Sequence, residues 1–158
     1  MNIHWRLPFR LLNNSVGFIT GDGSWRLTKF ELDVIGAAAA TLSPEDQAIL
    51  QYQLAQRFYV QRQHSCRMSD IHPYFPEKWP KMNHPREFCM AKLVVISKVS
   101  HMRVTVETYE GMIRAVRCQK PPGLIIIEPY QIKISTTGGP ITDNIATELN
   151  AMEHPEER

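Results

Sequence analysis

Alternating apolar and polar residues dominate residues 88–134 and predict the β-sheet of this protein. Apolar side chains occupy every second position from Met102 to Val106, with polar side chains between them. This period of two is typical of a strand that buries one face. The run from Ala91 to Ile96 is largely apolar on both faces, which is typical of an interior strand.

Gly111 marks a turn in this block, because glycine readily takes the positive φ that a two-residue hairpin loop requires. A strand over residues 112–118 is expected to return after it. Two further apolar segments, residues 124–127 and 131–134, follow a Pro-Pro-Gly break. The first predicts another strand, and the second predicts either its continuation past a bulge or an edge strand. The pattern therefore predicts a mainly antiparallel sheet of about four to five strands.

Two helix starts precede this block. Thr28 and Glu31 have the spacing of a capping box, so we expect a helix from about Lys29. Ser43 followed by Pro44 and two acids predicts a second start, since serine caps helices, proline suits the first turn and acids favour the positive end of the helix dipole. Together with the sheet, these signals predict an α+β fold with two N-terminal helices packed on one face.

Two different segments lie between the second helix and the main sheet: a stretch with a strand pattern and a proline-rich stretch. Alternation resumes between Tyr59 and Gln63 and predicts one strand that runs towards Ile71. Residues 72–86 then carry four prolines, which prevent regular structure, together with three aromatic rings that are too apolar for a free linker. We expect an ordered loop that lies over the core.

The length of 158 residues fits one domain with a substantial core. We assign residues 1–134 to a single α+β domain and expect the polar residues 135–158 to form a flexible tail. No apolar run reaches the roughly 20 residues of a membrane helix. Three widely spaced cysteines and a polar N-terminal segment without a signal core predict a reduced, cytoplasmic protein.

Four candidate metal ligands lie between residues 64 and 84, and they suggest an alternative function. His64, Cys66, His72 and His84 carry imidazole and thiolate groups, which are good ligands for zinc. Their spacing does not match a compact metal motif, so we predict no metal and no other cofactor. The alternative is a small metal-dependent enzyme or zinc protein. No nucleophile elbow or phosphate-binding loop occurs, which favours a protein that is not an enzyme.

A second alternative is nucleic-acid binding through Arg57, Arg62 and Arg67, which lie close to Tyr59. The net charge of +2 is small, whereas nucleic-acid binders usually carry a concentrated excess of basic residues. We therefore interpret these arginines as a solvated helix end.

Aromatic residues in and around the proline-rich loop are the strongest candidates for a binding surface. Tyrosine and tryptophan bury large areas and have few rotors to freeze, and proline lowers the ordering cost further. The alternative is that the rings cover the core. We interpret the protein as a non-catalytic protein-binding module, and its size also fits a bacterial immunity-type or antitoxin-like inhibitor. The predicted partner-binding residues are Trp25, Tyr74, Phe75, Trp79 and Tyr109.

Overall fold

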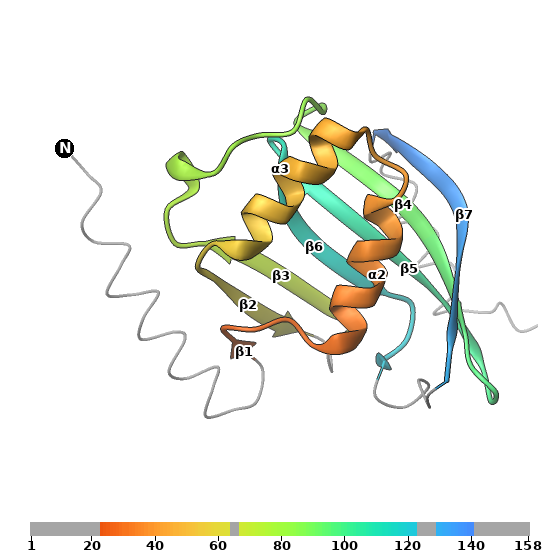
Figure 1. The fold of residues 1–158 in the computed structure, drawn as a ribbon. Coiled ribbons are helices and arrows are strands. Elements are labelled where there is room, and N and C mark those ends of the chain that lie inside the picture. Colours follow the sequence, from red (N-terminus) through yellow and green to blue (C-terminus); the bar gives the residue numbers. More distant parts are fainter. Residues whose placement is uncertain (1–22, 64–66, 123–128, 141–158) are drawn as a thin grey trace, which may run out of the picture.

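The computed structural model describes residues 23–63, 67–122 and 129–140. In this part of the chain two helices cover one face of a seven-stranded antiparallel sheet (Figure 1). Across the sheet the strands follow the order β1-β2-β3-β6-β5-β4-β7. The elements in chain order are β1 (Gly23–Ser24), α2 (Lys29–Ala39), α3 (Pro44–Ala55), β2 (Phe58–Gln63), β3 (Met68–Pro73), the 3₁₀ turn η1 (Pro76–Lys78), β4 (Glu87–Ile96), β5 (His101–Tyr109), β6 (Met112–Cys118) and β7 (Gln131–Pro140).

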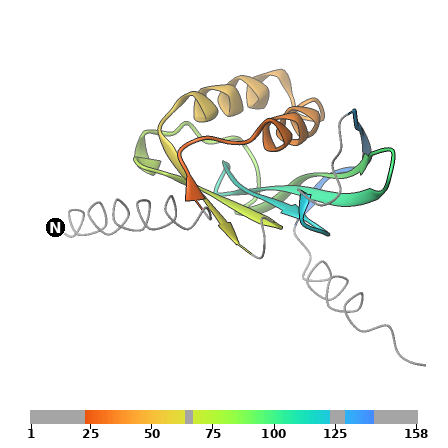
Figure 2. The same cartoon turned by 90° about the horizontal axis from the view of Figure 1, so that it is seen from below.

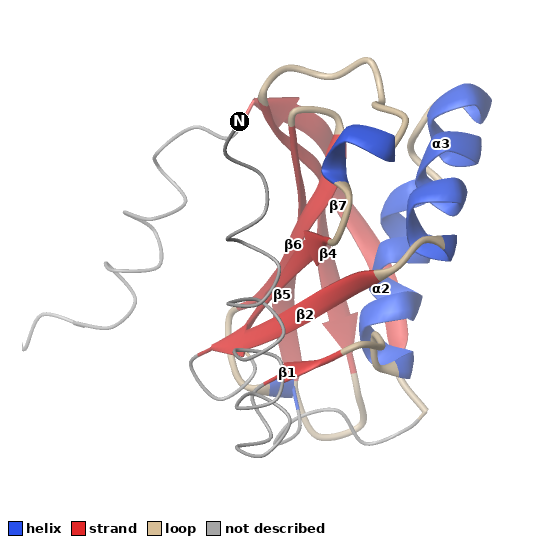
Figure 3. Cartoon of the chain, turned by 90° about the vertical axis from the view of Figure 1, so that its left-hand side faces the viewer, coloured by secondary structure: helices blue, strands red, loops and turns tan. Residues whose placement is uncertain are grey.

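The predicted α+β class is confirmed, and so is the packing of both helices on one face of the sheet (Figures 2 and 3). Two details of the prediction were wrong. The helices follow strand β1 instead of opening the fold, and the described residues form six strands of six or more residues besides the short β1. The predicted count was four to five.

The extra strand comes from residues 58–73, which the sequence pattern predicts as one strand. The structure forms the antiparallel pair β2 and β3 instead, with Val60 opposite Ile71. Arg62, Ser69 and Asp70 are buried in these strands and interrupt the apolar alternation, so the sequence signal for two strands is weak.

Both helices begin where their capping residues predict. Thr28 Oγ1 accepts a hydrogen bond from the Glu31 N–H, and Glu31 Oε2 accepts one from the Thr28 N–H, which completes the capping box. Ser43 Oγ accepts from the Asp46 N–H at the start of α3. These bonds satisfy backbone donors that have no partner inside a helix.

The predicted hairpin between β5 and β6 is confirmed. Glu110 and Gly111 both have positive φ, at 51° and 73°, as a tight two-residue turn requires. The Gly111 carbonyl accepts a hydrogen bond from the Met82 N–H at 2.9 Å, so the turn lies directly against the proline-rich loop. A Cβ atom at position 111 would lie 2.4 Å from the Met82 oxygen.

Strand β7 forms one edge of the sheet and pairs with β4, which makes β4 an interior strand as predicted. It continues to Pro140, past the boundary at residue 134 that the polar composition suggested. Residues 135–140 therefore pair with the sheet and do not belong to a tail. Residues 141–158, the predicted strand at 124–127 and most of the N-terminal segment lie outside the described residues.

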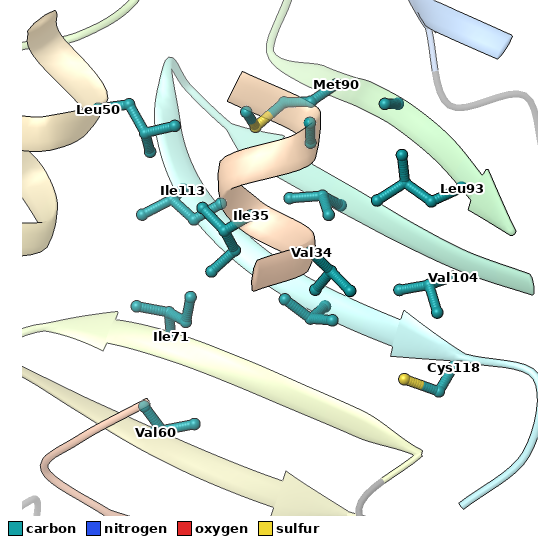
Figure 4. Packing of buried hydrophobic residues seen from close by; sticks show 14 of the residues in the cluster. Val34, Ile35, Leu50, Val60, Ile71, Met90, Leu93, Val104, Ile113 and Cys118 are labelled. Carbon is teal, nitrogen blue, oxygen red and sulfur yellow. The ribbon is translucent and has the colours of Figure 1, made fainter. Parts of the chain in front are cut away.

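The core lies between the helices and the sheet, where Val34, Ile35 and Leu50 face the apolar side chains of the strands (Figure 4). Trp79 and Met82 close this core from the proline-rich loop, and they are 4% and 3% exposed. The prediction of an ordered loop over the core is confirmed.

One buried amide connects three parts of the fold. Gln53 of α3 is fully buried, and its Nε2 donates to the Pro80 carbonyl at 2.6 Å and to the Gly111 carbonyl at 2.9 Å. Its Oε1 accepts from the Ile113 N–H at 2.9 Å. Helix α3, the proline-rich loop and the β5–β6 turn are thus joined by a single side chain.

We expect Gly111→Ala to lower the free energy of unfolding by at least about 1–2 kcal/mol, because alanine is disfavoured at positive φ and its Cβ would press on Met82. Gly36→Ala is the matched control. A Cβ at position 36 of α2 would meet no atom within 4 Å, so the control should gain roughly 0.5–1 kcal/mol. Urea denaturation measures both, and equal effects would contradict the role of the turn.

Candidate functional site

Trp25 and Tyr74 meet at one edge of the sheet although 49 residues separate them in the sequence. Trp25 directly follows β1, Tyr74 directly follows β3, and β2 lies between these two strands. The Trp25 Nε1–H donates a hydrogen bond to Tyr74 Oη at 2.9 Å. Trp25 is 51% exposed, and Phe75, the residue after Tyr74, is 41% exposed. We refer to Trp25, Tyr74 and Phe75 as the aromatic edge.

The backbone holds the aromatic edge in place. The Tyr74 N–H donates to the Arg57 carbonyl at 3.2 Å, which extends the pairing of β2 with β3 by one step. The Phe75 carbonyl accepts from the Lys78 N–H at 3.0 Å and closes the turn η1. The Lys78 ammonium lies 4.7 Å from the centre of the Phe75 ring, within the range of a cation–π contact. The Trp25 and Phe75 rings are therefore exposed, and the Tyr74 ring between them is half-buried.

The structure separates the other two predicted partner-binding residues from this group. Trp79 is buried and packs edge-on against Phe58, with ring centres 6.5 Å apart. It is a core residue, so the interpretation that the rings cover the core holds for this one. Tyr109 lies in β5, two strands across from β3, and its hydroxyl accepts a hydrogen bond from Arg86 Nε at 2.8 Å.

The candidate metal ligands do not form a described site. His64 and Cys66 lie outside the described residues. His72 stacks on Tyr59, and its Nδ1 lies 3.0 Å from the Arg114 guanidinium. His84 Nε2 lies 3.1 Å from Asp46 Oδ2, near the start of α3. Within residues 23–63, 67–122 and 129–140, no three His, Cys, Asp or Glu side chains come together as metal ligands would.

Arg62, one of the three arginines of the second alternative, is buried and paired with Glu31. Its Nε and Nη2 donate to Glu31 Oε1 and Oε2 at 3.0 and 2.6 Å, and both side chains are less than a tenth exposed. Ser69 Oγ donates to Glu31 Oε1 at 2.5 Å. Of the three arginines, Arg62 therefore lies in a buried ion pair and is not part of the surface.

The surroundings of Glu31 keep it ionised. Burial by itself raises the pKa of this carboxyl, but hydrogen bonds from Arg62, Ser69 and the Thr28 backbone outweigh burial and hold the pKa below its ordinary value. The charge of Glu31 is thus matched inside the fold and takes no part in a surface site.

The face of the sheet away from the helices carries two buried carboxylates. Asp70 and Glu107 lie opposite Ala115 from its two sides, so they are two strand spacings apart, about 10 Å. Glu107 Oε2 accepts from Arg117 Nε at 2.7 Å, and Asp70 Oδ2 accepts from Gln63 Nε2 at 3.2 Å. Each carboxylate has its own local partner, as expected of structural charges.

Cys89 lies opposite Glu107 in the neighbouring strand. Burial, and then the charge of Glu107, raise the pKa of the Cys89 thiol. Since the thiolate is the reactive form, this thiol is a poor nucleophile and a small core side chain.

A groove of about 270 Å³ lies between α2 and α3. Its lining is apolar apart from two glutamines, Gln47 and Gln51. Without a titratable side chain this groove supplies neither an acid nor a base.

Comparison with models of protein families, with curated proteins and with solved structures gives no match to this chain. The described residues contain no helix with the length and apolar character that crossing a membrane requires.

The sequence reasoning missed two sets of charged residues. The first is the buried pair of Glu31 and Arg62. The sequence explains Glu31 as part of a capping box and does not indicate that it also forms an ion pair. The second is a group of exposed cations, Lys92, Arg103 and Lys133, on the strands of the main sheet. A signal for the second set exists, because residues 88–106 contain no acidic residue.

We expect Arg62→Met to destabilise the protein by about 3 kcal/mol or more, since it leaves the Glu31 charge buried without its partner. The double variant Glu31→Gln/Arg62→Met should recover most of this loss, because replacing both members of a buried pair is often nearly neutral. Chemical denaturation of the two variants tests this. An equally large loss in the double variant would contradict the assignment.

Glu31 also predicts a pH dependence. A folded-state pKa below the ordinary value of about 4.3 adds stability that is complete above that pH and is lost as the pH falls through the folded pKa. The double variant should therefore show a shallower loss of unfolding free energy below about pH 4.3 than the unchanged protein. Asp33 and Asp46, whose pKa values are also lowered, contribute equally to both proteins, and parallel acid profiles would contradict a role for Glu31.

Proposed function

We propose that this protein is a non-catalytic protein-binding module that contacts its partner through the aromatic edge. The observation that carries the proposal is the hydrogen bond from the Trp25 indole to the Tyr74 hydroxyl, at 2.9 Å, between two rings at the surface. A bond between distant parts of the sequence keeps the two rings in a fixed arrangement before any partner arrives.

Physical arguments support such a role for these rings. Exposed tryptophan, tyrosine and phenylalanine side chains offer large apolar areas, and binding sites concentrate their energy in a few such anchors. Pro73 and Pro76 flank Tyr74 and Phe75, and the backbone bonds of this loop are already made. Little ordering entropy remains to oppose binding.

The chemistry of the described residues favours binding over catalysis. The buried carboxylates Glu31 and Glu107 are each paired with an arginine, and the Cys89 thiol has a raised pKa. Cys89 and Cys118 are both buried free thiols, which supports the further proposal that the protein acts in a reducing compartment such as the cytoplasm. The inhibitor form of this function stays a prediction from size and composition.

The experiment is quantitative affinity capture from the source cells with the unchanged protein and with a Trp25→Ala/Phe75→Ala variant. One protein in stoichiometric amount should bind the unchanged protein, and its recovery should fall at least roughly tenfold with the variant, since truncating anchor residues costs about 2 kcal/mol or more. The melting temperature should stay nearly constant because both rings are about half exposed.

Tyr52→Ala is the matched control, since Tyr52 is also an aromatic residue at 51% exposure but lies on α3. Capture should be unchanged by it. Trp79→Ala serves as a second comparison and should lower the stability by about 3–5 kcal/mol, as expected of a buried tryptophan. Equal recovery with the Trp25/Phe75 variant and the unchanged protein would refute the proposal.

A further inference from the structure

Charge is distributed unevenly between the two layers of the fold. Residues 29–55, which form the helices, contain one lysine and four acidic residues. The described residues 87–122 and 129–140, which include β4, β5, β6 and β7, contain seven lysines and arginines but only three glutamates. The two parts thus carry formal charges of −3 and +4, opposite in sign, although the net charge of the whole chain is only +2.

Strand register places three of the cations together on the face away from the helices. Arg103 of β5 and Lys133 of β7 both lie opposite Val94 of β4, from its two sides. Lys92 lies two positions before Val94 and therefore points to the same face. The neighbouring residue Leu93 is fully buried towards the helices, which fixes the orientation of the alternation. We refer to Lys92, Arg103 and Lys133 as the basic patch.

All three side chains of the basic patch are exposed. No ion pair involves any of them within the described part of the chain, and Glu107, on the same face, is bound by Arg117. Lys92 and Arg103 are diagonal neighbours, roughly 7–8 Å apart, and Arg103 and Lys133 are two strand spacings apart, about 10 Å. Like charges at these distances repel one another and attract an anion.

The spacing favours an extended anion over a small one. The three cations lie side by side on the face of three adjacent strands and do not converge on one point. Thr136 of β7 is exposed and lies opposite Lys92, so a hydroxyl group lies beside the cations. Lysine, arginine and threonine side chains on an open surface are typical ligands of backbone phosphates.

An acidic protein surface fits this patch less well. Protein interfaces are depleted of lysine, and two of the three cations of this patch are lysines. Single-stranded nucleic acids bind to positively charged surfaces that follow the phosphate backbone, and the three cations extend across three adjacent strands.

We propose that the basic patch binds the phosphate backbone of a single-stranded nucleic acid. This activity goes beyond the protein-binding role and does not depend on it. The patch lies on β5, β4 and β7, whereas the aromatic edge lies beside β1 and β3 at the other side of the sheet (Figure 1). Both surfaces are therefore accessible at the same time.

The test is fluorescence anisotropy of the full chain with a labelled 20-nucleotide oligouridine between about 50 and 200 mM salt. Binding should weaken as salt rises. Changing Lys92, Arg103 and Lys133 together to glutamine should lower the affinity roughly tenfold or more and reduce the slope of log affinity against log salt by about 2, as expected for three contacts to a single strand. The melting temperature should not fall, because the change removes mutual repulsion.

The matched control changes Lys29, Arg57 and Lys81 to glutamine, which alters the net charge equally at exposed positions outside the patch. It should leave the affinity within about twofold and the salt slope nearly unchanged. A Trp25→Ala/Phe75→Ala variant should bind the oligonucleotide normally, which separates this proposal from the protein-binding role.

Four results would overturn the proposal. They are no binding of the oligonucleotide at low salt, equal salt slopes for the patch variant and the unchanged protein, tighter binding to a duplex of the same length, and equal competition by polyglutamate or by phosphatidylserine vesicles. The last result would assign the patch to acidic proteins or to membranes.

Discussion

The buried ion pair of Glu31 and Arg62 is the interaction on which the two-layer arrangement depends. Glu31 caps α2 through the Thr28 N–H and also binds Arg62 of β2 and Ser69 of β3. One carboxylate thus sets both where α2 begins and where it contacts the sheet. Since an unpaired buried charge costs several kcal/mol, any displacement of α2 along the sheet is strongly disfavoured.

The proline-rich loop, which carries part of the aromatic edge, is held in place by its contacts with the rest of the fold. Gln53 attaches the proline-rich loop to the β5–β6 turn, and Trp79 closes the core beneath that loop. With its far end fixed in this way, the loop can present Tyr74 and Phe75 to solvent in one conformation. Gln53 and Trp79 hold the loop against the core, so the rings of the aromatic edge are not needed for packing and can face solvent.

Local signals in the sequence predicted local structure well. The capping residues Thr28 and Ser43 and the turn at Gly111 act through neighbours in the chain, so their effect can be read without the fold. Burial depends on distant residues, and the sequence therefore did not distinguish buried Trp79 from exposed Trp25. Arg62 appeared in the sequence as part of a basic stretch, because its acidic partner lies 31 positions away. The basic patch escaped notice because its members are adjacent only across strands, and the net charge averages them with the acidic helices.

The opposite charges of the helix layer and the sheet have a consequence for how the molecule moves before it binds anything. Within the described residues, the acidic residues of the helices and the basic residues of β4, β5 and β7 give this part of the chain an electric dipole that crosses the sheet. In the field of a polyanion, this dipole favours the orientation in which the sheet faces the polyanion. The same asymmetry favours head-to-tail contact between copies at low ionic strength, because the helices of one copy attract the sheet of the next. Physiological salt, with a Debye length of about 8 Å, limits both effects to close approach.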